Sequence, residues 1–173
     1  SRKGGASGFI STLPLVQKPL VAAVDGLAIG VGTTMLFHCD LVYASPTASL
    51  RTPFLDLGLV PEAASSLLAP RRMGHARAFE LLCLGEAFDA ERSLQAGIVN
   101  KIVPAAELEA AALLAAKRLA AKPPGALAAA RKLMKGEPDA IMAQIKREGE
   151  VFAERLASPE AKEAFTAFME KRA

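Results

Sequence analysis

The first part of the chain has short, uninterrupted apolar segments that end at turn-forming residues. PLVAAVDG at 19–26 stays apolar until its closing Asp-Gly, and LVYAS at 41–45 has the same character. Continuous runs of this length are typical of strands buried on both faces, as in parallel sheets. Further strands are predicted at 48–53 and 98–103, whereas LAIGVG at 27–32 has the pattern of a small-residue loop.

Helical patterns alternate with these strands. Residues 1–8 are rich in Gly and Ser, and we expect them to be mobile. Pro61 suits the first turn of a helix, Asp89 can cap one, and Gly97 can close it. Helices are predicted at 9–17, at about 33–40, at 62–72, at 74–84 and at 90–96.

The character of the chain changes after Pro104. Residues 105–173 lack strand patterns and are rich in Ala, Leu, Lys and Glu, and Pro and Gly breakers divide them into four helical segments. The pattern therefore predicts an α/β core over residues 1–104, followed by a C-terminal helical region over residues 105–173.

Composition excludes several classes of protein. The 173 residues are 51% hydrophobic and 23% charged, which is typical of a folded globular chain. A net charge of +3, no Trp and one Tyr do not favour nucleic-acid binding. No apolar run reaches the roughly 18 residues of a membrane span. Cys39 and Cys83 lack metal-ligand spacing and suggest buried residues in a reducing, cytoplasmic compartment.

Three clusters are candidates for chemistry. In DGLAIGVGTT (25–34), glycines allow a sharp turn from a strand into a helix whose free N–H groups favour negative charge. In RTPFLDLGLVPEAASS (51–66), Glu62 follows a proline and is either an ordinary first-turn residue or a catalytic base. In EAFTAFMEKR (163–172), apolar residues share one helix face. His38 and His75 have no catalytic pattern around them.

Taken in order, these segments resemble the crotonase superfamily, the enoyl-CoA hydratase/isomerase family. The resemblance rests on KPLVAAVDGLAIGVG, CDLVYASPTASL, LGLVPEAASSLL, GHARAFELLCLGEAFDAERSLQAGIVNKIVP and FTAFMEKR, and it covers about residues 17–173. It implies a spiral of ββα turns followed by C-terminal helices that assemble homotrimers or dimers of trimers. It also implies an acyl-CoA thioester substrate and no cofactor or metal, because coenzyme A is part of the substrate.

The resemblance also implies roles for individual residues. Val31, between Gly30 and Gly32, corresponds to a backbone N–H that stabilises a thioester enolate, and Ala28 and Phe54 are expected beside the substrate. One preplaced donor of this kind can contribute about 3 kcal/mol to transition-state stabilisation.

Two departures distinguish the chain from the hydratases of that family. Their two catalytic glutamates correspond here to Thr34 and Phe54, which cannot activate water as carboxylates do. The pattern TPF…LG…PE…SS instead resembles the Δ3,Δ2-enoyl-CoA isomerases, and Glu62 corresponds to their catalytic base. Leu55, Leu59 and neighbouring apolar residues are expected to keep its surroundings dry and to raise its pKa.

The C-terminal helix carries two further expected contacts. By resemblance, Phe168 would pack against the adenine of a neighbouring subunit's coenzyme A, and Lys171 would approach its phosphates. Members of the family have several tens of residues before the segment that starts at Lys18, and they include one oxyanion donor. A hydratase or another crotonase-type lyase or hydrolase using Asp56 or Glu62, and a non-catalytic oligomerising or acyl-CoA-binding module, stay open as alternatives.

Overall fold

The computed structural model describes residues 5–171 and contains two small sheets. The first has the order β1 (Val21–Val24), β3 (Leu41–Ala44), β6 (Lys101–Ile102), and its strands are parallel. The second has the order β2 (Leu27–Ile29), β4 (Ser49–Arg51), β5 (Phe88–Asp89). In this sheet β2 and β4 are parallel, and β5 is antiparallel to β4.

The first four strands alternate between the two sheets along the chain. β1 is followed by a turn with Gly26 at φ 74° and then by β2, and β3 is followed by a turn at residues 45–48 and then by β4. In the first sheet Val21 of β1 pairs with Leu41 of β3, and in the second sheet Leu27 of β2 pairs with Ser49 of β4. The strands β3 and β4 therefore lie beside β1 and β2, respectively. This repeat, with helical segments after each pair, is the ββα spiral that the resemblance implied.

Short helices fill the space between and around the sheets. The core contains α2 (Val31–Thr34) continued by the 3-10 helix η2 (Met35–His38), the 3-10 helix η3 (Leu55–Leu57), α3 (Ser65–Met73), α4 (His75–Leu82) and α5 (Ala90–Gln95). The predicted cap of α5 is confirmed, because the Asp89 side chain accepts a hydrogen bond from the Arg92 N–H at 2.8 Å. Before the strands lie α1 (Ala6–Thr12) and η1 (Leu13–Leu15).

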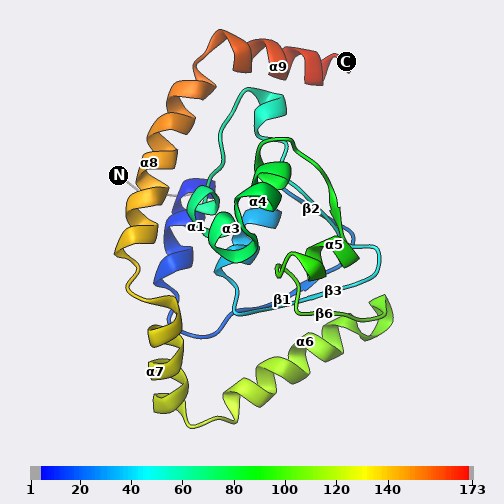
Figure 1. Cartoon of the computed structure of the whole chain (residues 1–173), viewed down its shortest axis with the longest axis vertical. Helices are drawn as coiled ribbons and strands as arrows, with labels where there is room; N and C mark the ends of the chain where they lie inside the picture. Colours follow the sequence, from blue (N-terminus) through cyan, green and yellow to red (C-terminus); the bar gives the residue numbers. More distant parts are fainter. Residues whose placement is uncertain (1–4, 172–173) are drawn as a thin grey trace.

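Four helices follow the core, as the breakers predicted. They are α6 (Ala105–Ala120), α7 (Pro124–Lys135), α8 (Asp139–Leu156) and α9 (Pro159–Met169). In Figure 1 they form an arc that runs below the sheets, up one side and over the opposite end of the core. From α6 to α9 the chain thus passes elements of the core that lie much earlier in the sequence. The division into two domains at residue 104 stays a prediction.

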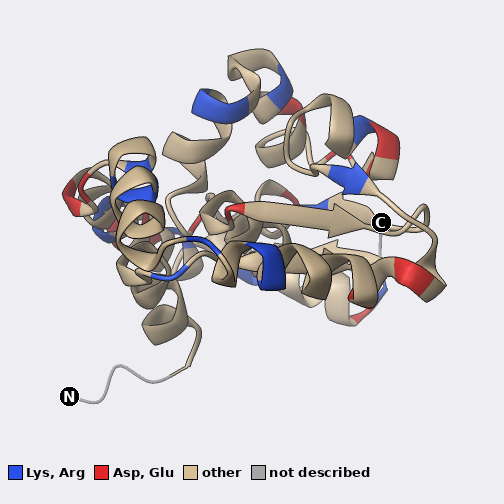
Figure 2. Cartoon of the chain, turned by 90° about the horizontal axis from the view of Figure 1, so that it is seen from below, with Lys and Arg blue, Asp and Glu red and all other residues tan. Residues whose placement is uncertain are grey.

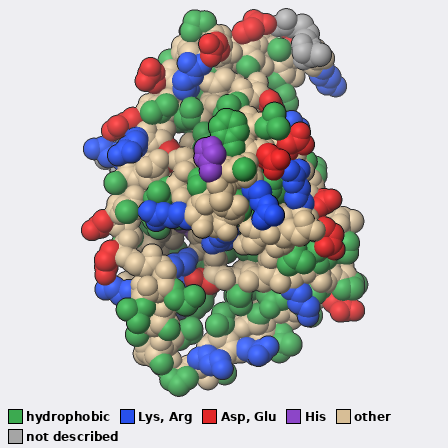
Figure 3. Space-filling model, in the orientation of Figure 1, with side chains coloured by type: hydrophobic (Ala, Val, Ile, Leu, Met, Phe, Trp, Pro, Cys, Tyr) green, Lys and Arg blue, Asp and Glu red, His purple; other side chains and the backbone are tan. Residues whose placement is uncertain are grey.

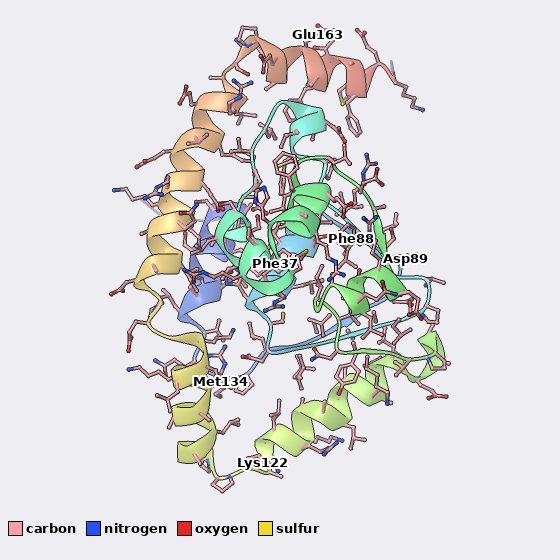
Figure 4. The ribbon with its side chains drawn as sticks, in the orientation of Figure 1. Phe37, Phe88, Asp89, Lys122, Met134 and Glu163 are labelled. Atoms are coloured by element: carbon pink, nitrogen blue, oxygen red, sulfur yellow. The ribbon has the colours of Figure 1, made fainter. Side chains whose placement is uncertain are left out.

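The core lies between the sheets and the helices that cover them. Its most completely buried large side chains come from β3, β4, α4, β5 and the segment after α5: Val42, Leu50, Leu81, Phe88 and Ile98. Phe37 and Phe88 both point into the interior in Figure 4. All four residues of β3 are buried or half-buried, in agreement with the continuous apolar run that predicted a strand covered on both faces.

Asp40 fixes α7 to the core at the start of β3. Its carboxylate accepts hydrogen bonds from the Leu20 N–H at 2.7 Å and from Arg131 Nε at 3.0 Å. Arg131 also donates to the Val16 carbonyl at 2.7 Å, and Lys135 donates to the His38 carbonyl. Because both partners of the Arg131–Asp40 pair are largely buried, the pair is less screened than a surface ion pair.

Several element predictions were wrong in detail. Residues 27–29, expected in a loop, form strand β2, because the edge of β4 offers them backbone hydrogen-bond partners. Residues 6–8, expected to be mobile, belong to α1; residues 1–4 lie outside the described residues. The helix expected from 62 begins only at Ser65, since Ala63 and Ala64 have left-handed backbones, each with φ 57°.

Charges are distributed over the whole fold. Figure 2 shows Lys, Arg, Asp and Glu interspersed on helices and strands, with neither sign collected on one face. Between residues 5 and 171, no helix is long and apolar enough to cross a bilayer. In the same part of the chain, no three His, Cys, Asp or Glu side chains are grouped as a metal ion would require.

Candidate functional site

The segment that carries Glu62 is an irregular turn between η3 and α3. Gly58 ends η3 with φ 67° and ψ 18°, and Ala63 and Ala64 have positive φ just before the helix. Left-handed conformations are uncommon for residues with a Cβ and persist where surrounding contacts hold them. The turn therefore places Glu62 ahead of α3, in a position that a regular first helical turn would not give.

The Glu62 carboxyl is half-buried and faces α2. Its Oε1 accepts a hydrogen bond from the Thr34 hydroxyl at 2.5 Å. Burial raises the pKa of Glu62, the Thr34 hydrogen bond opposes that rise, and the negative charge of Glu148 adds to it. A carboxyl with a raised pKa is a stronger proton acceptor once ionised, and such a pKa is typical of a general base.

The α2 helix that carries Thr34 begins at the glycine-rich turn. Gly30 has φ 58° and ψ −119°, a conformation that favours glycine, and its N–H donates to the Arg51 carbonyl at 2.9 Å. The N–H groups of Thr33 and Thr34 both donate to the Gly30 carbonyl. Within residues 5–171, the N–H groups of Val31 and Gly32 have no hydrogen-bond partner. Two free donors thus lie in the same helical turn as the residue that binds Glu62.

Glu148 from α8 binds the other side of the Glu62 turn. Only 6% of its surface is exposed, and its Oε2 accepts from the Ala64 N–H at 2.6 Å. Its Oε1 accepts from the Ser66 N–H at 3.0 Å and from the Ser66 hydroxyl. Burial raises the pKa of Glu148, and the hydrogen bonds from Ser66 and Ala64 work against that rise.

His38 reaches the same turn from η2. Its Nε2 lies 2.7 Å from the Ala63 carbonyl, so the neutral ring donates there from the Nε2–H tautomer. Burial lowers the pKa of His38, and the nearby Lys135 and Arg72 lower it further, while the Ala63 hydrogen bond raises it. His38 therefore supports the turn and does not face the Glu62 carboxyl through any hydrogen bond described here.

The apolar residues expected around Glu62 are only partly enclosed. Phe54 and Leu59 are buried, in agreement with the expected dry surroundings, but Leu55 is 46% exposed and does not contribute to them. Asp56, the alternative residue for positioning water, forms an exposed ion pair with Arg51 at 3.1 Å. Ala28 is buried, and its carbonyl accepts a hydrogen bond from the Thr33 hydroxyl. This bond fixes the strand that leads into the Gly30 turn.

Phe168 and Lys171 lie at the C-terminal end of α9 and shortly after it. Phe168 is 69% exposed, and Lys171 is exposed with φ 54°. Figure 1 places this end at the extreme of the arc of helices. Their contact with a neighbouring subunit's ligand stays a prediction. An exposed ring and an exposed ammonium are available for such a contact.

Several hollows border α7, another lies between α1 and β1, and Glu62 lines none of these. Two of them, of about 430 and 490 Å³, lie between α7 and the segment 14–19. Glu137, which lines the first, is exposed and paired with Lys132 at 3.0 Å. On the face drawn in Figure 3, hydrophobic side chains lie along α6 and α7 among Lys and Arg. Asp40, which lines a further hollow beside α7, is paired with Arg131 at 3.0 Å and is therefore not a free base.

Sequence reasoning missed Thr34, Glu148 and His38 as residues of this site. Thr34 was considered only as the replacement for a glutamate, and its hydroxyl proves to bind Glu62 directly. Glu148 lies more than 80 residues from the turn that it binds, and no local pattern indicates that contact. The only available signal was a carboxylate facing inward on α8.

Comparison with known proteins gives consistent similarities. A sequence model described as enoyl-CoA hydratase/isomerase matches residues 7–173. Enoyl-CoA delta isomerase 2 of Rattus norvegicus is 34% identical over 165 residues, 95% of this chain and 42% of that protein. The mitochondrial enoyl-CoA hydratase of Pongo abelii is 32% identical over 161 residues, 92% of this chain and 56% of that protein.

A solved structure is similar along the whole chain. It is that of an enoyl-CoA hydratase/isomerase from Pseudoalteromonas atlantica T6c, 44% identical with a TM-score of 0.95, and the match covers 100% of this chain and 71% of that one. The chain spans about half the length of the curated relatives it matches, between 42% and 56% for three of them.

Proposed function

The chain belongs to the enoyl-CoA hydratase/isomerase family, and from this premise we propose that it binds an acyl-CoA thioester and moves a double bond from 3-enoyl-CoA to 2-enoyl-CoA. One observation carries the choice of reaction. The Glu62 carboxyl accepts a hydrogen bond from Thr34, at the end of the short helix α2 that begins with the free N–H groups of Val31 and Gly32. By resemblance, Thr34 and Phe54 stand at the positions of the two glutamates of the family's hydratases.

Glu62 acts in this proposal as the base. Its carboxylate takes a proton from C2, and the electrons of that C–H bond form a C1–C2 double bond while the electrons of the thioester carbonyl move onto its oxygen, which gives a dienolate. When the carbonyl re-forms, the C1–C2 electrons form the C2–C3 double bond, and the electrons of the C3–C4 double bond take up a proton at C4. The same carboxyl returns the proton to C4, so no atom or electron is gained or lost. A single base suffices when the proton leaves and returns on one face of the substrate.

The Val31 N–H stabilises the intermediate. Removal of the C2 proton shifts negative charge onto the thioester oxygen, and a preplaced donor lowers the energy of that charge. Val31 and Gly32 both offer free N–H groups at the start of α2, and Gly30 provides the turn that exposes them. Ala28, Gly32 and Phe54 would border the acyl group. Because the donor is the main-chain N–H of Val31, the kind of side chain at this position does not decide whether the donor is present.

Exchange of Glu62 for Gln tests the proposal. We expect Glu62→Gln to lower kcat for a 3-enoyl-CoA by at least about 100-fold, since general-base catalysis typically contributes 10²–10⁴-fold. Circular dichroism should be unchanged, because the amide can still accept from Thr34. Glu109→Gln, an exchange of an exposed glutamate on α6, is the matched control and should keep full activity. Full activity in Glu62→Gln would disprove the assignment.

Hydration of 2-enoyl-CoA is the second candidate, because the similar proteins include hydratases as well as an isomerase. The structure disfavours it on one observation: Asp56, the other acidic residue of the loop, is exposed and paired with Arg51. The same assay with a 2-enoyl-CoA separates the two reactions. Formation of a 3-hydroxyacyl-CoA, at a rate above that of isomerisation, would favour the hydratase.

We also propose that residues 105–173 assemble the chain into homotrimers or dimers of trimers. Exposed apolar side chains support this proposal, since Leu133 and Met134 on α7 are 86% and 88% exposed. In such an assembly Phe168 and Lys171 would reach the coenzyme A of a neighbouring subunit. A location in the cytoplasm stays a prediction.

A further inference from the structure

Glu148 is bound to the main chain of the turn that carries Glu62. Its two carboxylate oxygens accept from the N–H groups of Ala64 and Ser66, at 2.6 and 3.0 Å, and from the Ser66 hydroxyl. The α3 helix has no side-chain cap from its own N-terminal residues. A carboxylate that lies more than 80 residues further along the chain therefore takes the place of a local cap.

The conformation that Glu148 binds is one that the turn would not favour alone. Ala63 and Ala64 both have φ 57°, and both are buried. Ala64 is left-handed and is followed by helical Ser65, and a turn of this kind directs neighbouring N–H groups toward a common side, where they bind an anion. Without an acceptor, the N–H group of the buried Ala64 would be unpaired, which favours a different path for the chain.

We propose that Glu148 is a positioning residue for Glu62: by accepting from Ala64 and Ser66, its carboxylate holds the left-handed turn that directs the Glu62 carboxyl to Thr34 and the free N–H groups of α2. This inference rests on the proposed function of Glu62 as the base. It assigns to α8, in the C-terminal helical region, a direct part in arranging the candidate site.

The neighbours of the turn define what else can affect it. Among the described residues, Glu148 from α8 and His38 from η2 are the titratable groups that bind its main chain, and Thr34 from α2 binds Glu62. Gln144 from α8 donates to the Ser66 hydroxyl at 2.8 Å. Glu148 is thus the group that brings a negative charge close to Glu62.

The charge of Glu148 affects the pKa of Glu62, and this effect can be measured separately from any loss of structure. The charge of Glu148 raises the pKa of Glu62, so its removal lowers that pKa. A base with a lower pKa stays ionised at lower pH, and the acid limb of the pH–rate profile moves to lower pH. Loss of folded protein alone would reduce the amplitude of the profile and leave that limb in place.

The experiment compares Glu148→Gln and Glu148→Asp with Glu154→Gln in the intact protein. Glu154 lies on the same helix and is exposed, so its exchange removes the same charge away from the turn. We expect kcat for a 3-enoyl-CoA to fall roughly 10- to 100-fold in both Glu148 variants, because small displacements of a catalytic group have effects of this size. KM should change by less than about threefold.

The pH profile separates the two variants. Glu148→Gln should move the acid limb to lower pH, whereas Glu148→Asp, which keeps the charge on a shorter side chain, should lower kcat with much less movement. Hydrogen exchange at Ala64 and Ser66 should accelerate in both. If kcat, the acid limb and exchange in Glu148→Gln match those of Glu154→Gln, the proposal is wrong.

The outcome is distinguishable from a failure of the proposed function. If the protein does not isomerise a 3-enoyl-CoA, the titration of the Glu62 carboxyl can still be followed by ¹³C NMR in both Gln variants. A lower Glu62 pKa in Glu148→Gln, together with faster exchange at Ala64 and Ser66, supports the positioning role without any assay of turnover. An unchanged titration and unchanged exchange overturn it.

Discussion

The hydrogen bond between Thr34 and Glu62 determines which form of the carboxyl is favoured at the candidate site. Burial favours the neutral acid, and the hydroxyl donor favours the carboxylate, which is the form that can remove a proton. Thr34 is fully buried, so its hydroxyl has no competing contact with bulk solvent. At the position that corresponds to a glutamate of the hydratases, the chain therefore has a hydroxyl donor, and this donor opposes the rise in the pKa of Glu62.

Replacement of Thr34 by Val should remove the hydrogen bond to Glu62 while nearly conserving the volume of the side chain. Without the donor, the pKa of Glu62 rises further, so the acid limb of the pH–rate profile should move to higher pH. We expect kcat near neutral pH to fall about tenfold, because a hydrogen bond to a charged group contributes about 1.5 kcal/mol. Thr34→Ser, which keeps the hydroxyl, should retain the wild-type limb. Movement of the limb to lower pH in Thr34→Val would contradict this account.

The residue-level chemistry was only partly predictable from sequence. Glu62 was identified from its place after Pro61 and from the resemblance, and Gly30 from its turn pattern. The partners that fix the position of Glu62 were not identified, since Thr34 and Glu148 lie 28 and 82 to 84 residues away from the residues that they bind. Such contacts depend on packing between elements, and hydrophobic periodicity carries no information about them.

At the scale of elements, the apolar strand segments were predicted because burial on both faces leaves a strong pattern. The strands β2 and β5 were not, because they are three and two residues long and contain small or isolated apolar residues. Their strand geometry comes from pairing with β4. The late start of α3 has a similar origin, since Glu148 and His38 hold Ala63 and Ala64 outside the helix.

The loop that leads to Glu62 is also fixed by α9. A Cβ on Gly58 would lie 2.8 Å from the Ala161 N and 2.9 Å from its Cα, and the residue has φ 67°. Both the backbone conformation and the lack of space therefore require glycine here. The contact joins the beginning of α9 to Gly58 at the end of η3, four residues ahead of the candidate base.

We expect Gly58→Ala to lower the free energy of unfolding by about 2–4 kcal/mol, combining the cost of a left-handed alanine with that of overpacking. Gly97→Ala is the matched control, because Gly97 has φ 74° and its nearest neighbour atoms would lie 4.0 Å from a Cβ. This variant should lose only about 1 kcal/mol. Chemical denaturation measures both, and equal losses would show that the α9 contact adds nothing.

At the scale of the whole molecule, the C-terminal helices complete the candidate site that the α/β core begins. The core provides Glu62, Thr34 and the free N–H groups of α2, and α8 provides the carboxylate that holds the turn. Asp40 and Arg131 fix α7 to the start of β3, so α8 follows from an anchored helix. Cutting the chain near residue 104 would therefore separate the base from its support.

His38 makes the stability of this assembly sensitive to pH, because it lies between the Glu62 turn and α7. Its pKa is lowered in the folded protein from the ordinary value of 6.5, chiefly by burial. As the pH falls below about 6.5, the unfolded chain takes up a proton that folded His38 resists, so the folded state loses stability. The slope from this group is at most about 1.4 kcal/mol per pH unit.

Glu62 and Glu148 act in the opposite direction at lower pH. Their pKa values are raised in the folded protein, so the folded state binds protons more readily than the unfolded chain as the pH falls toward 4.5. The loss of stability caused by His38 should therefore be clearest just below its ordinary pKa, before the two carboxyls begin to offset it.

Exchange of His38 for Gln isolates the histidine contribution, since the amide can still donate to the Ala63 carbonyl but does not titrate. Between about pH 7.5 and about pH 5.5, the free energy of unfolding should fall less in His38→Gln than in the wild type. His75→Gln, which removes an exposed histidine on α4, should keep the wild-type slope. A wild-type slope in His38→Gln and a reduced one in His75→Gln would assign the pH dependence to the surface. The reverse assigns it to the buried ring that joins the turn carrying the candidate base to the helices behind it.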